Sequence, residues 1–357
     1  MKTAVVILNW NTKGFLERFL PGLLDSVRSE DACVIVADSA STDGSMQMMR
    51  ERFPDVRRIE LDGNYGFTGG YNRALAQVDA EYYVLINSDI EVTPGWLGPL
   101  VQWMDSHPDC GACGPKLLSW QDHRRFEYAG AAGGRIDRWG YPFCRGRILK
   151  RIEEDYGQYC APADVFWATG ACLMTRSVLW HRLGGLDERF FAHMEEIDYC
   201  WRLQLQGWRI CNVPASVVYH VGGGTLPQTS PRKLKFNFRN NLLMLENNLA
   251  YTFVAQGCRP ARALRKARHL ITWRKVLDGG SALVYLLTGR LKYVRAVLDA
   301  HAEARALRTP VTVGELTWWS DAHPDLHITG RYGGSIILAS LLKGDGVFEY
   351  IESKMKS

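Results

Sequence analysis

The sequence predicts an α/β fold with a mixed, mostly parallel central sheet and a helical C-terminal region. Short apolar runs alternate with stretches of helical apolar spacing through the first third of the chain, a pattern typical of βαβ units. Apolar residues make up 46% of the composition and charged residues 23%, which is enough for a substantial core. The length, 357 residues, exceeds that of a typical domain. We therefore expect one large domain followed by an appendage.

The elements of the first third follow one another in a regular order. Apolar runs predict strands over residues 4–8, 33–37, 57–61 and 82–87. Between them, apolar spacing predicts helices over residues 14–27, 45–53 and 71–78. Each strand ends in polar or glycine-rich residues, and the glycine-rich segment 64–70 is expected to be a turn or a close approach to a nucleotide. Because ligands of open α/β sheets bind beyond the carboxyl ends of the strands, we expect a crevice at that edge.

The remaining two thirds have a different character. Residues 110–225 mix short strands with turns, and residues 233–249 have helical spacing. The segment 259–308 carries twelve Lys and Arg residues against three acidic residues. Such a basic amphipathic region suits an anionic membrane surface, and a solvated helical face packed on the core is the alternative. The segment 318–342 is expected either to dock as a helix or to pack in the core.

Charge and cysteine content narrow the classes of function. A formal net charge of +5 is too small to make nucleic acid the expected partner. The nine cysteines lie in apolar contexts, which favours free thiols in a reducing, cytoplasmic compartment. Cys110 and Cys113 form a lone CxxC, so buried thiols are expected rather than a zinc site. The apolar N-terminus reads as a strand and not a signal peptide, and no apolar run is long enough to predict a spanning helix.

Three groups of polar residues carry the candidate chemistry. Asp89 follows an apolar strand and is suited to Mg²⁺ or Mn²⁺, which prefer oxygen ligands. Glu195, Glu196 and Asp198 open a predicted helix, where the dipole favours acids, but crowding can also raise a pKa into the range of a general base. His220 ends an apolar run beside three glycines, and it is either a structural residue or a contact to phosphate or metal.

Seven segments in register resemble the family 2 glycosyltransferases, within them the rhamnosyltransferase-like subgroup. They span roughly residues 3 to 245 and are 5–11, 38–44, 64–72, 85–89, 169–172, 190–202 and 220–225. The resemblance implies a GT-A fold, with a Rossmann-like nucleotide-binding half. It divides the chain into a catalytic domain over 1–225, with a nucleotide-sugar half to about 110 and an acceptor half over 111–225, and a helical, basic region over 226–357.

The resemblance also implies a role for each motif. A nucleotide-diphosphate sugar, dTDP- or UDP-linked, would lie against Asn9, Asn11, Asp38, Asn64, Gly66, Asn72, Asn87 and Asp89. Asp89 matches the last acid of the family's DxD-type motif, and Asn87 stands here in place of the first acid. Asp89 would hold the metal together with His220. Thr169, Gly170 and Ala171 would line the acceptor end. Glu196 matches the expected base, and Glu195 and Asp198 are the alternatives because Glu195-Glu196 replaces the usual Glu-Asp.

The sequence therefore predicts an inverting, metal-dependent transferase that moves a sugar to a hydroxyl of a glycan or lipid-linked acceptor, in surface polysaccharide or O-antigen synthesis. The basic segment 259–308 predicts peripheral contact with the inner face of the cytoplasmic membrane. Two alternatives remain open. One is a catalytically silent protein that binds a nucleotide sugar or glycan. The other is a sugar-phosphate nucleotidyltransferase, which would normally have a Gly-rich, basic loop in place of residues 9–12.

Overall fold

The structure is a computed structural model that describes residues 1–222, 230–323 and 326–355. Its main sheet has the strand order β11-β13-β6-β12-β4-β1-β2-β3, and β5 pairs with β13. The parallel strands of the first third are β1 (Thr3–Asn9), β2 (Ala32–Ser39), β3 (Arg57–Leu61) and β4 (Tyr82–Ile86). The other members are β5 (Ile90–Val92), β6 (Cys110–Ser119), β11 (Ala163–Asp164), β12 (Cys172–Arg176) and β13 (Arg209–His220).

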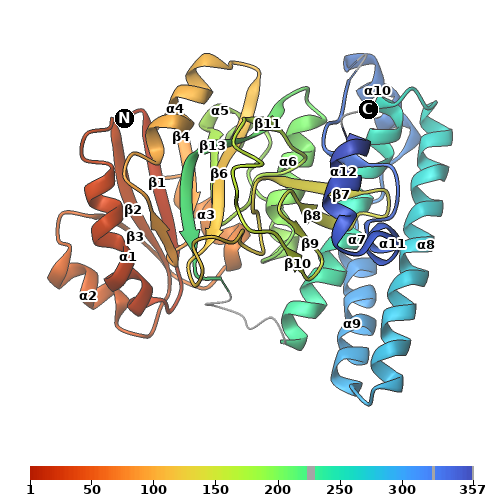
Figure 1. The fold of residues 1–357 in the computed structure, drawn as a ribbon, viewed down its shortest axis with the longest axis horizontal. Helices are drawn as coiled ribbons and strands as arrows, with labels where there is room; N and C mark the ends of the chain where they lie inside the picture. The colour runs from red at the N-terminus through yellow and green to blue at the C-terminus, as the bar shows by residue number, and fades with distance from the viewer. Residues whose placement is uncertain (223–229, 324–325, 356–357) are drawn as a thin grey trace.

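Strand direction determines which residues meet at the edge of this sheet. β12 runs antiparallel to both β4 and β6, and β6 runs parallel to β13. β6 and β13 therefore share the direction of β1 to β4, and the carboxyl ends of all six strands lie at one edge. That edge faces the lower side of the view in Figure 1, where the β13 arrow ends. His220 thus lies at the same edge as Asn9, although 211 positions separate them in the sequence.

Alternation along the strands buries both faces of the sheet. Val5 and Ile7 pack in a core layer with α1 (Lys13–Ser26), α2 (Ser45–Arg52) and α4 (Leu97–Ser106). Ala4 and Val6 point the other way, into a layer with α3 (Gly66–Leu75), α5 (Ser177–Arg182), α6 (Glu195–Gln204) and α7 (Pro231–Ala255). Side chains alternate in direction along a strand, so one continuous apolar run serves both layers.

A smaller sheet and the C-terminal helices complete the molecule (Figure 1). This sheet has the order β10-β9-β8-β7-β14 and contains β7 (Gly134–Asp137), β8 (Pro142–Cys144), β9 (Arg147–Ile148), β10 (Arg151–Ile152) and β14 (Arg331–Tyr332). The helices are α8 (Pro260–Leu287), α9 (Leu291–Leu307), α10 (Val313–Ala322), α11 (Ile336–Lys343) and α12 (Val347–Met355). No helix in the described ranges is long and apolar enough to cross a membrane.

The predicted elements differ from the observed ones mainly at α3. The glycine-rich segment 64–70 was expected to be a turn before a helix over 71–78, but α3 begins at Gly66 and ends at Leu75. Its first amides are capped from a distant segment, because the backbone N–H groups of Phe67 and Thr68 donate to the carbonyl of Phe191 at 2.7 and 3.2 Å. No local pattern reveals such a cap. The basic segment 259–308 forms α8 and α9, and Cys110 and Cys113 are buried thiols on β6, as predicted.

Candidate active site

The paired ends of β1 and β2 form one wall of the site. Asn9 lies beside Asp38 in the strand register, and its Nδ2 donates to Asp38 Oδ1 at 2.6 Å and to Ser45 Oγ at 2.9 Å. Its Oδ1 accepts from Thr12 Oγ1 at 2.5 Å. Asn9 and Asp38 are both buried. Asn9 is therefore fully hydrogen-bonded inside the wall, and it holds the Asp38 carboxylate in place at the sheet edge.

The other predicted nucleotide residues extend this wall and connect it to distant loops. Asn11 is exposed and accepts from the Thr42 amide at 2.7 Å, and Asn64 accepts from the Gly66 amide at 2.9 Å. Asn72 lies deeper. Its Nδ2 donates to the Leu186 carbonyl at 2.8 Å and its Oδ1 accepts from the Leu186 amide at 3.0 Å. Asn72 therefore joins α3 to the loop before α6, which leaves little of its amide for a ligand.

Asp89 and His220 meet at the centre of the edge, and a third residue joins them. His220 Nε2 lies 3.2 Å from Asp89 Oδ1, and His220 Nδ1 lies 3.3 Å from Glu127 Oε1. All three side chains are buried. The contact with Glu127 is an ion pair without hydrogen-bond geometry, since His220 Nδ1 has no hydrogen-bond partner. Gly223 to Thr225, the end of the expected His220 motif, lie outside the described residues.

Burial and charge act in opposite directions on this cluster. Burial alone would lower the pKa of His220, but the two carboxylates outweigh it and raise that pKa to about 10. Burial would raise the pKa of Asp89, and the hydrogen bond and charge of His220 outweigh it and lower that pKa. Asp89 and Glu127 supply carboxylate oxygens, the ligands that Mg²⁺ and Mn²⁺ prefer, whereas His220 with its raised pKa is protonated near neutral pH and would bind an ion only after losing that proton. Asp89 would hold the ion, with diphosphate oxygens and water as further ligands. Among the described residues, no three His, Cys, Asp or Glu side chains are placed so that they could hold a metal ion by themselves.

Two carboxyl groups at the start of α6 are held in an environment that favours their neutral form. Burial raises the pKa of Glu196 to about 7, and burial together with the charge of Glu196 raises that of Glu195 well above its usual value. The Oε2 atoms of both residues are buried without a hydrogen-bond partner. The backbone N–H of Gly170 partly opposes this effect of burial, because its interaction with the Glu196 carboxyl group lowers the pKa. A carboxyl group with a pKa near 7 is matched to general base catalysis.

Asp198 has a different environment from its two neighbours. Arg202 Nε donates to its Oδ2 at 2.8 Å, and Asn248 and Asn247 donate to its Oδ1 at 2.7 and 3.1 Å. Asp198 is completely buried by these partners. It therefore ties α6 to α7, and its lone pairs are already used by protein donors.

The predicted acceptor segment connects the metal motif to the glutamates. The carbonyl of Ala171 accepts from the Asn87 amide at 2.9 Å. Thr169 Oγ1 donates to the Ala129 carbonyl at 2.9 Å. A Cβ atom added at Gly170 would lie 3.5 Å from Glu196 Cβ. The structure thus joins the turn that carries Asp89 to the segment 169–171 by a backbone hydrogen bond, and places Gly170 of that segment against the first turn of α6.

Comparison with known proteins shows the family to which the chain belongs. A model described as glycosyl transferase family 2 matches residues 4–181. The chain is also 32% identical over 233 residues to the N-acetylglucosaminyl-diphospho-decaprenol L-rhamnosyltransferase of Mycobacterium tuberculosis, which covers 60% of this chain and 75% of that protein. The chain belongs to glycosyl transferase family 2. The predicted resemblance is confirmed, and this family favours a glycosyltransferase over a nucleotidyltransferase.

Solved structures show the fold of this glycosyltransferase. S. aureus TarS 1–349 in complex with UDP-GlcNAc matches with a TM-score of 0.54 at 15% identity, over 91% of this chain and 88% of that one. GalNAc-T7 with UDP, GalNAc and Mn²⁺ matches with a TM-score of 0.53 at 17% identity, over 67% of this chain and 47% of that one. The predicted GT-A fold with a helical C-terminal part is confirmed by these similarities.

Sequence reasoning missed the residues that hold the segment just before α6, residues 190–194. Phe191, His193 and Met194, just before α6, have φ angles of 62°, 73° and 71°, in the left-handed region. Asn240 Nδ2 lies 3.0, 2.8 and 2.7 Å from the carbonyl oxygens of Phe190, Ala192 and His193. Arg239 Nη2 donates to the Phe190 carbonyl at 2.6 Å. The signal was present, because Arg239 and Asn240 are among the polar residues of the predicted helix 233–249, but the groups that they contact were not evident.

Glu127 was missed for a different reason. It lies in the irregular segment between β6 and β7, where the sequence offers no periodicity to place it. Its Oε2 accepts a short hydrogen bond from the Ala129 amide, which turns its Oε1 toward His220. The His220 contact that gives Glu127 its role depends on the pairing of β6 with β13, a long-range feature.

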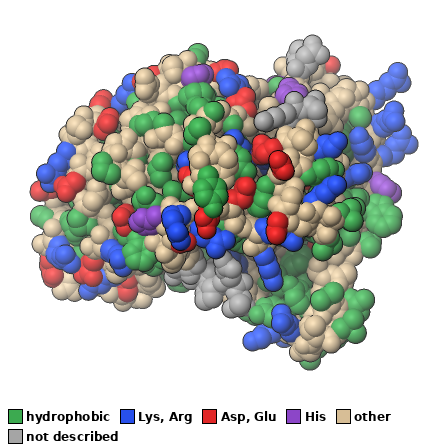
Figure 2. Space-filling model, in the orientation of Figure 1, with side chains coloured by type: hydrophobic (Ala, Val, Ile, Leu, Met, Phe, Trp, Pro, Cys, Tyr) green, Lys and Arg blue, Asp and Glu red, His purple; other side chains and the backbone are tan. Residues whose placement is uncertain are grey.

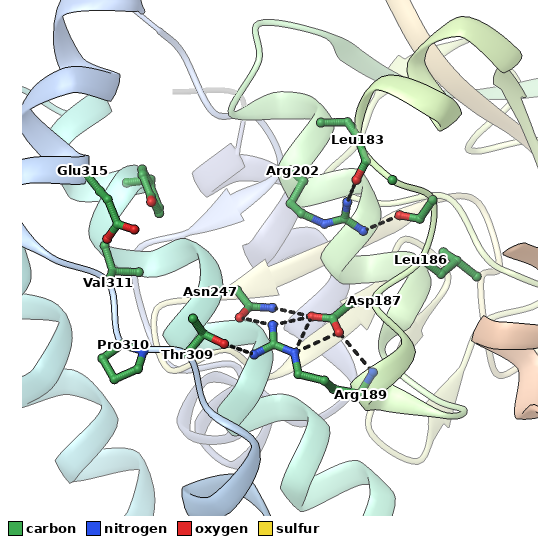
Figure 3. A pocket seen from close by; sticks show the side chains of 13 residues that line it. Leu183, Leu186, Asp187, Arg189, Arg202, Asn247, Thr309, Pro310, Val311 and Glu315 are labelled. Atoms are coloured by element: carbon green, nitrogen blue, oxygen red, sulfur yellow. Dashed lines mark hydrogen bonds and ion pairs between the residues drawn. The ribbon is translucent and has the colours of Figure 1, made fainter.

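A cavity of about 440 Å³ lies away from these residues (Figure 3). The loop 183–189, α7 and the segment 309–315 line it. Arg189 crosses its wall and donates to Asp187, to Asn247 Oδ1 at 2.8 Å and to Thr309 Oγ1 at 3.0 Å. None of the predicted site residues lines this cavity, and its two arginines, Arg189 and Arg202, already donate to protein groups. It is a junction between the catalytic body and the C-terminal helices.

Proposed function

We propose that this chain is an inverting, metal-dependent glycosyltransferase that uses Glu196 as its base. The observation that carries the proposal is the Glu196 carboxyl group, with its pKa raised to about 7, beside Gly170 in the segment that is hydrogen-bonded to Asn87, two residues before Asp89. Inversion requires a base opposite the leaving group. Glu195 is buried, whereas Glu196 is partly exposed to solvent. The carboxylate of Asp198 is already hydrogen-bonded to protein side chains. Glu196 is therefore the best candidate of the three.

The proposed reaction is a single displacement at the anomeric carbon. The acceptor hydroxyl, held against Thr169 to Ala171, gives its proton to a Glu196 oxygen as its own oxygen forms a bond to that carbon. The bond between the carbon and the donor phosphate breaks, and the nucleoside diphosphate leaves with the electron pair. Asp38 and Asn11 would orient the nucleoside, and Asp89 with His220 would hold a Mg²⁺ or Mn²⁺ ion. When bound, such an ion would offset the charge that develops on the diphosphate.

The proposed substrates follow from the family and the site. The donor would be a dTDP- or UDP-linked sugar, and the acceptor a glycan on a lipid diphosphate, by similarity to the mycobacterial rhamnosyltransferase. This places the enzyme in the assembly of a surface polysaccharide or O-antigen. The nine free thiols support a reducing, cytoplasmic setting.

The first test separates transfer from binding. Wild-type protein would be incubated with a panel of nucleotide sugars, Mn²⁺ and a lipid-linked acceptor, with and without a chelator. We expect product only with metal, and an anomeric configuration opposite to that of the donor by NMR. Stabilisation of the protein by a nucleotide sugar without any turnover would instead indicate a silent binding protein. Product of retained configuration would contradict the single displacement.

The second test assigns the base by comparing three variants. Glu196→Gln should lower kcat by about 10²-fold to 10⁴-fold, the usual contribution of a general base, and leave the binding of UDP or dTDP unchanged. Glu195→Gln should keep most of the activity. Asp198→Asn should lower stability more than kcat per folded molecule, because it breaks the ion pair with Arg202. Near-wild-type transfer by Glu196→Gln would move the base to another acid.

A further inference from the structure

The turn between α8 and α9 presents a cluster of large apolar side chains to solvent. Within nine residues, Leu283, Val284, Leu286, Leu287 and Leu291 are each more than half exposed, and Leu287 is 77% exposed. Soluble proteins rarely leave such a contiguous patch uncovered unless it binds something. We name these residues together with the first turn of α9, residues 283–295, the hairpin tip. We propose that the hairpin tip docks on the surface of an anionic lipid bilayer.

The hairpin tip projects from the body of the enzyme. Lys235, one turn into α7, pairs with Glu303 of α9 at 2.7 Å, and α9 begins twelve residues earlier than Glu303. At 1.5 Å per helical residue, the start of α9 lies about 12 Å beyond the start of α7. Figure 1 shows the α8–α9 turn as the lowest point of the view, on the side to which the carboxyl ends of the strands point. The tip and the candidate active site therefore face the same way.

The base of the hairpin is firmly fixed, so the tip is held out and does not fold back. Asp278 is fully buried and accepts from Arg274 Nε at 2.8 Å and lies 3.1 Å from His301 Nε2. Ala296, Val297 and Ala300 are buried between the helices. Two adjacent glycines, Gly279 and Gly280, follow this anchor and have open space around them. The exposed leucines begin only beyond these two glycines.

The charge of the hairpin tip identifies the kind of surface that it fits. Arg290, Lys292 and Arg295 lie among the leucines, and no acidic residue occurs over positions 279–298. The next acidic residue, Asp299, lies 3.7 Å from Arg295, so Arg290 and Lys292 carry most of the charge offered to a surface. Figure 2 shows basic and hydrophobic side chains together on this protrusion. Basic and apolar groups on one surface suit a bilayer whose headgroups are anionic and whose interior is apolar. A second copy of the tip is disfavoured, because three cations would face three cations.

The sequence predicted membrane contact for the whole basic segment 259–308, and the proposal restricts that contact to the hairpin tip. In the structure, Arg274 of that segment is buried in an ion pair and Lys275 lies 3.8 Å from Glu246, so neither is available to a membrane. The proposal rests on the proposed function only in one respect. A lipid-linked acceptor would explain why the tip and the active site face the same side.

Vesicle flotation tests the proposal without any need for transfer activity. Wild-type protein would be mixed with vesicles of phosphatidylcholine alone or with phosphatidylglycerol added, at low and at physiological salt. We expect binding to the anionic vesicles only, weaker at the higher salt. The variant Leu286→Ser with Leu287→Ser should bind at least tenfold more weakly. Replacing Arg290 and Lys292 by Ser should cost about fivefold for each cation.

The matched control lies on another helix. Leu341 and Leu342 of α11 are 76% and 72% exposed, so serine at both positions removes at least as much exposed apolar surface as it does at Leu286 and Leu287. This control should bind vesicles like wild type. Equal loss in both double variants, or no binding of wild type to anionic vesicles at low salt, would overturn the proposal. So would a dimer in sedimentation that only the Leu286→Ser and Leu287→Ser variant dissociates. Vesicle binding without any sugar transfer would instead refute the proposed function and leave the docking site intact.

Discussion

The clamp made by Asn240 should be needed for catalysis more than for folding. Its amide contacts three carbonyl oxygens of the segment 190–193, and that segment leads directly into Glu195 and Glu196. Asn240→Ala removes these hydrogen bonds and leaves the carbonyls buried without them. At about 1–2 kcal/mol for each of the two lost donors, the free energy of unfolding should fall by about 2–4 kcal/mol.

The effect on activity should exceed what this loss of stability explains. Phe191, His193 and Met194 occupy the left-handed region, which costs on the order of 1–3 kcal/mol for each residue and persists only while the surroundings enforce it. Without the clamp, the segment is expected to relax and to displace the start of α6. A shift of about 1 Å in a reacting group can cost 10²-fold in rate. We therefore expect kcat per folded molecule to fall at least tenfold, with little change in the KM for the donor.

The neighbouring residue provides the control. Asn241 is equally buried on α7, but it donates to the Gly140 carbonyl at 2.6 Å and accepts from Arg274, both far from α6. Asn241→Ala should lower the free energy of unfolding, measured by urea denaturation, by a similar amount, and leave kcat per folded molecule near wild type. Since Asn240 is a positioning residue, its alanine variant should also shift the apparent pKa of the pH–rate profile. If both variants reduced kcat equally, the clamp would have no special role.

Three further predictions concern Glu196 and the start of α3. Because the base must be ionised and its pKa is raised to about 7, log kcat/KM should rise with pH up to about 7 and then level off; a profile that is flat between pH 5 and 8 would exclude Glu196. A raised pKa also means that stability is lost as pH rises from the ordinary value of 4.5 through about 7. At pH 8.5, the free energy of unfolding of Glu196→Gln should therefore exceed that of wild type by up to about 3 kcal/mol, and near pH 4 the two should be equal. Equal stability at both pH values would show that burial does not destabilise the ionised carboxyl group. Finally, Gly66→Ala should destabilise the fold by more than about 2 kcal/mol, since its φ is +70° and its Cβ would meet the Phe191 carbonyl oxygen. The matched change Gly22→Ala, in open space on α1, should stabilise by up to about 1 kcal/mol, and similar melting temperatures for the two variants would contradict the role of that contact.

The sequence predicted the parts of the fold that depend on local patterns. Apolar runs located β1 to β4 because strands buried on both faces need an unbroken apolar stretch. The edge on which the polar residues meet followed from strand direction alone. The start of α3 could not be predicted, because its cap is the Phe191 carbonyl, a group that any residue could supply. Two-residue strands such as β14 carry no pattern at all, so the smaller sheet was also missed.

The candidate site was predictable to the same extent. Motif order placed Asp89, His220 and Glu196, but not what surrounds them. Glu127 contacts His220 only because β6 pairs with β13. Asn240 contacts the segment just before α6 although it lies 44 positions after Glu196 in the sequence. Asp198 and Asn72 were predicted as functional residues, and the structure gives both of them protein partners instead. A carboxylate or an amide looks the same in sequence whether its partner is a substrate or another residue.

β14 and α12 contact β7 although they lie far from it in the sequence, and this separation affects the order in which the parts of the protein can fold. Arg135 of β7 forms a two-point ion pair with Glu352, with contacts of 2.6 and 3.1 Å across 217 positions of sequence. β14 adds itself to β7, and the Ile336 amide donates to Asp137 at 3.0 Å. During synthesis, β7 must wait for nearly all of the following chain to leave the ribosome before its edge is covered. Residues 1–110 can fold early, but the smaller sheet is completed only after α12 has been made, because Glu352 of α12 follows Arg135 by 217 positions.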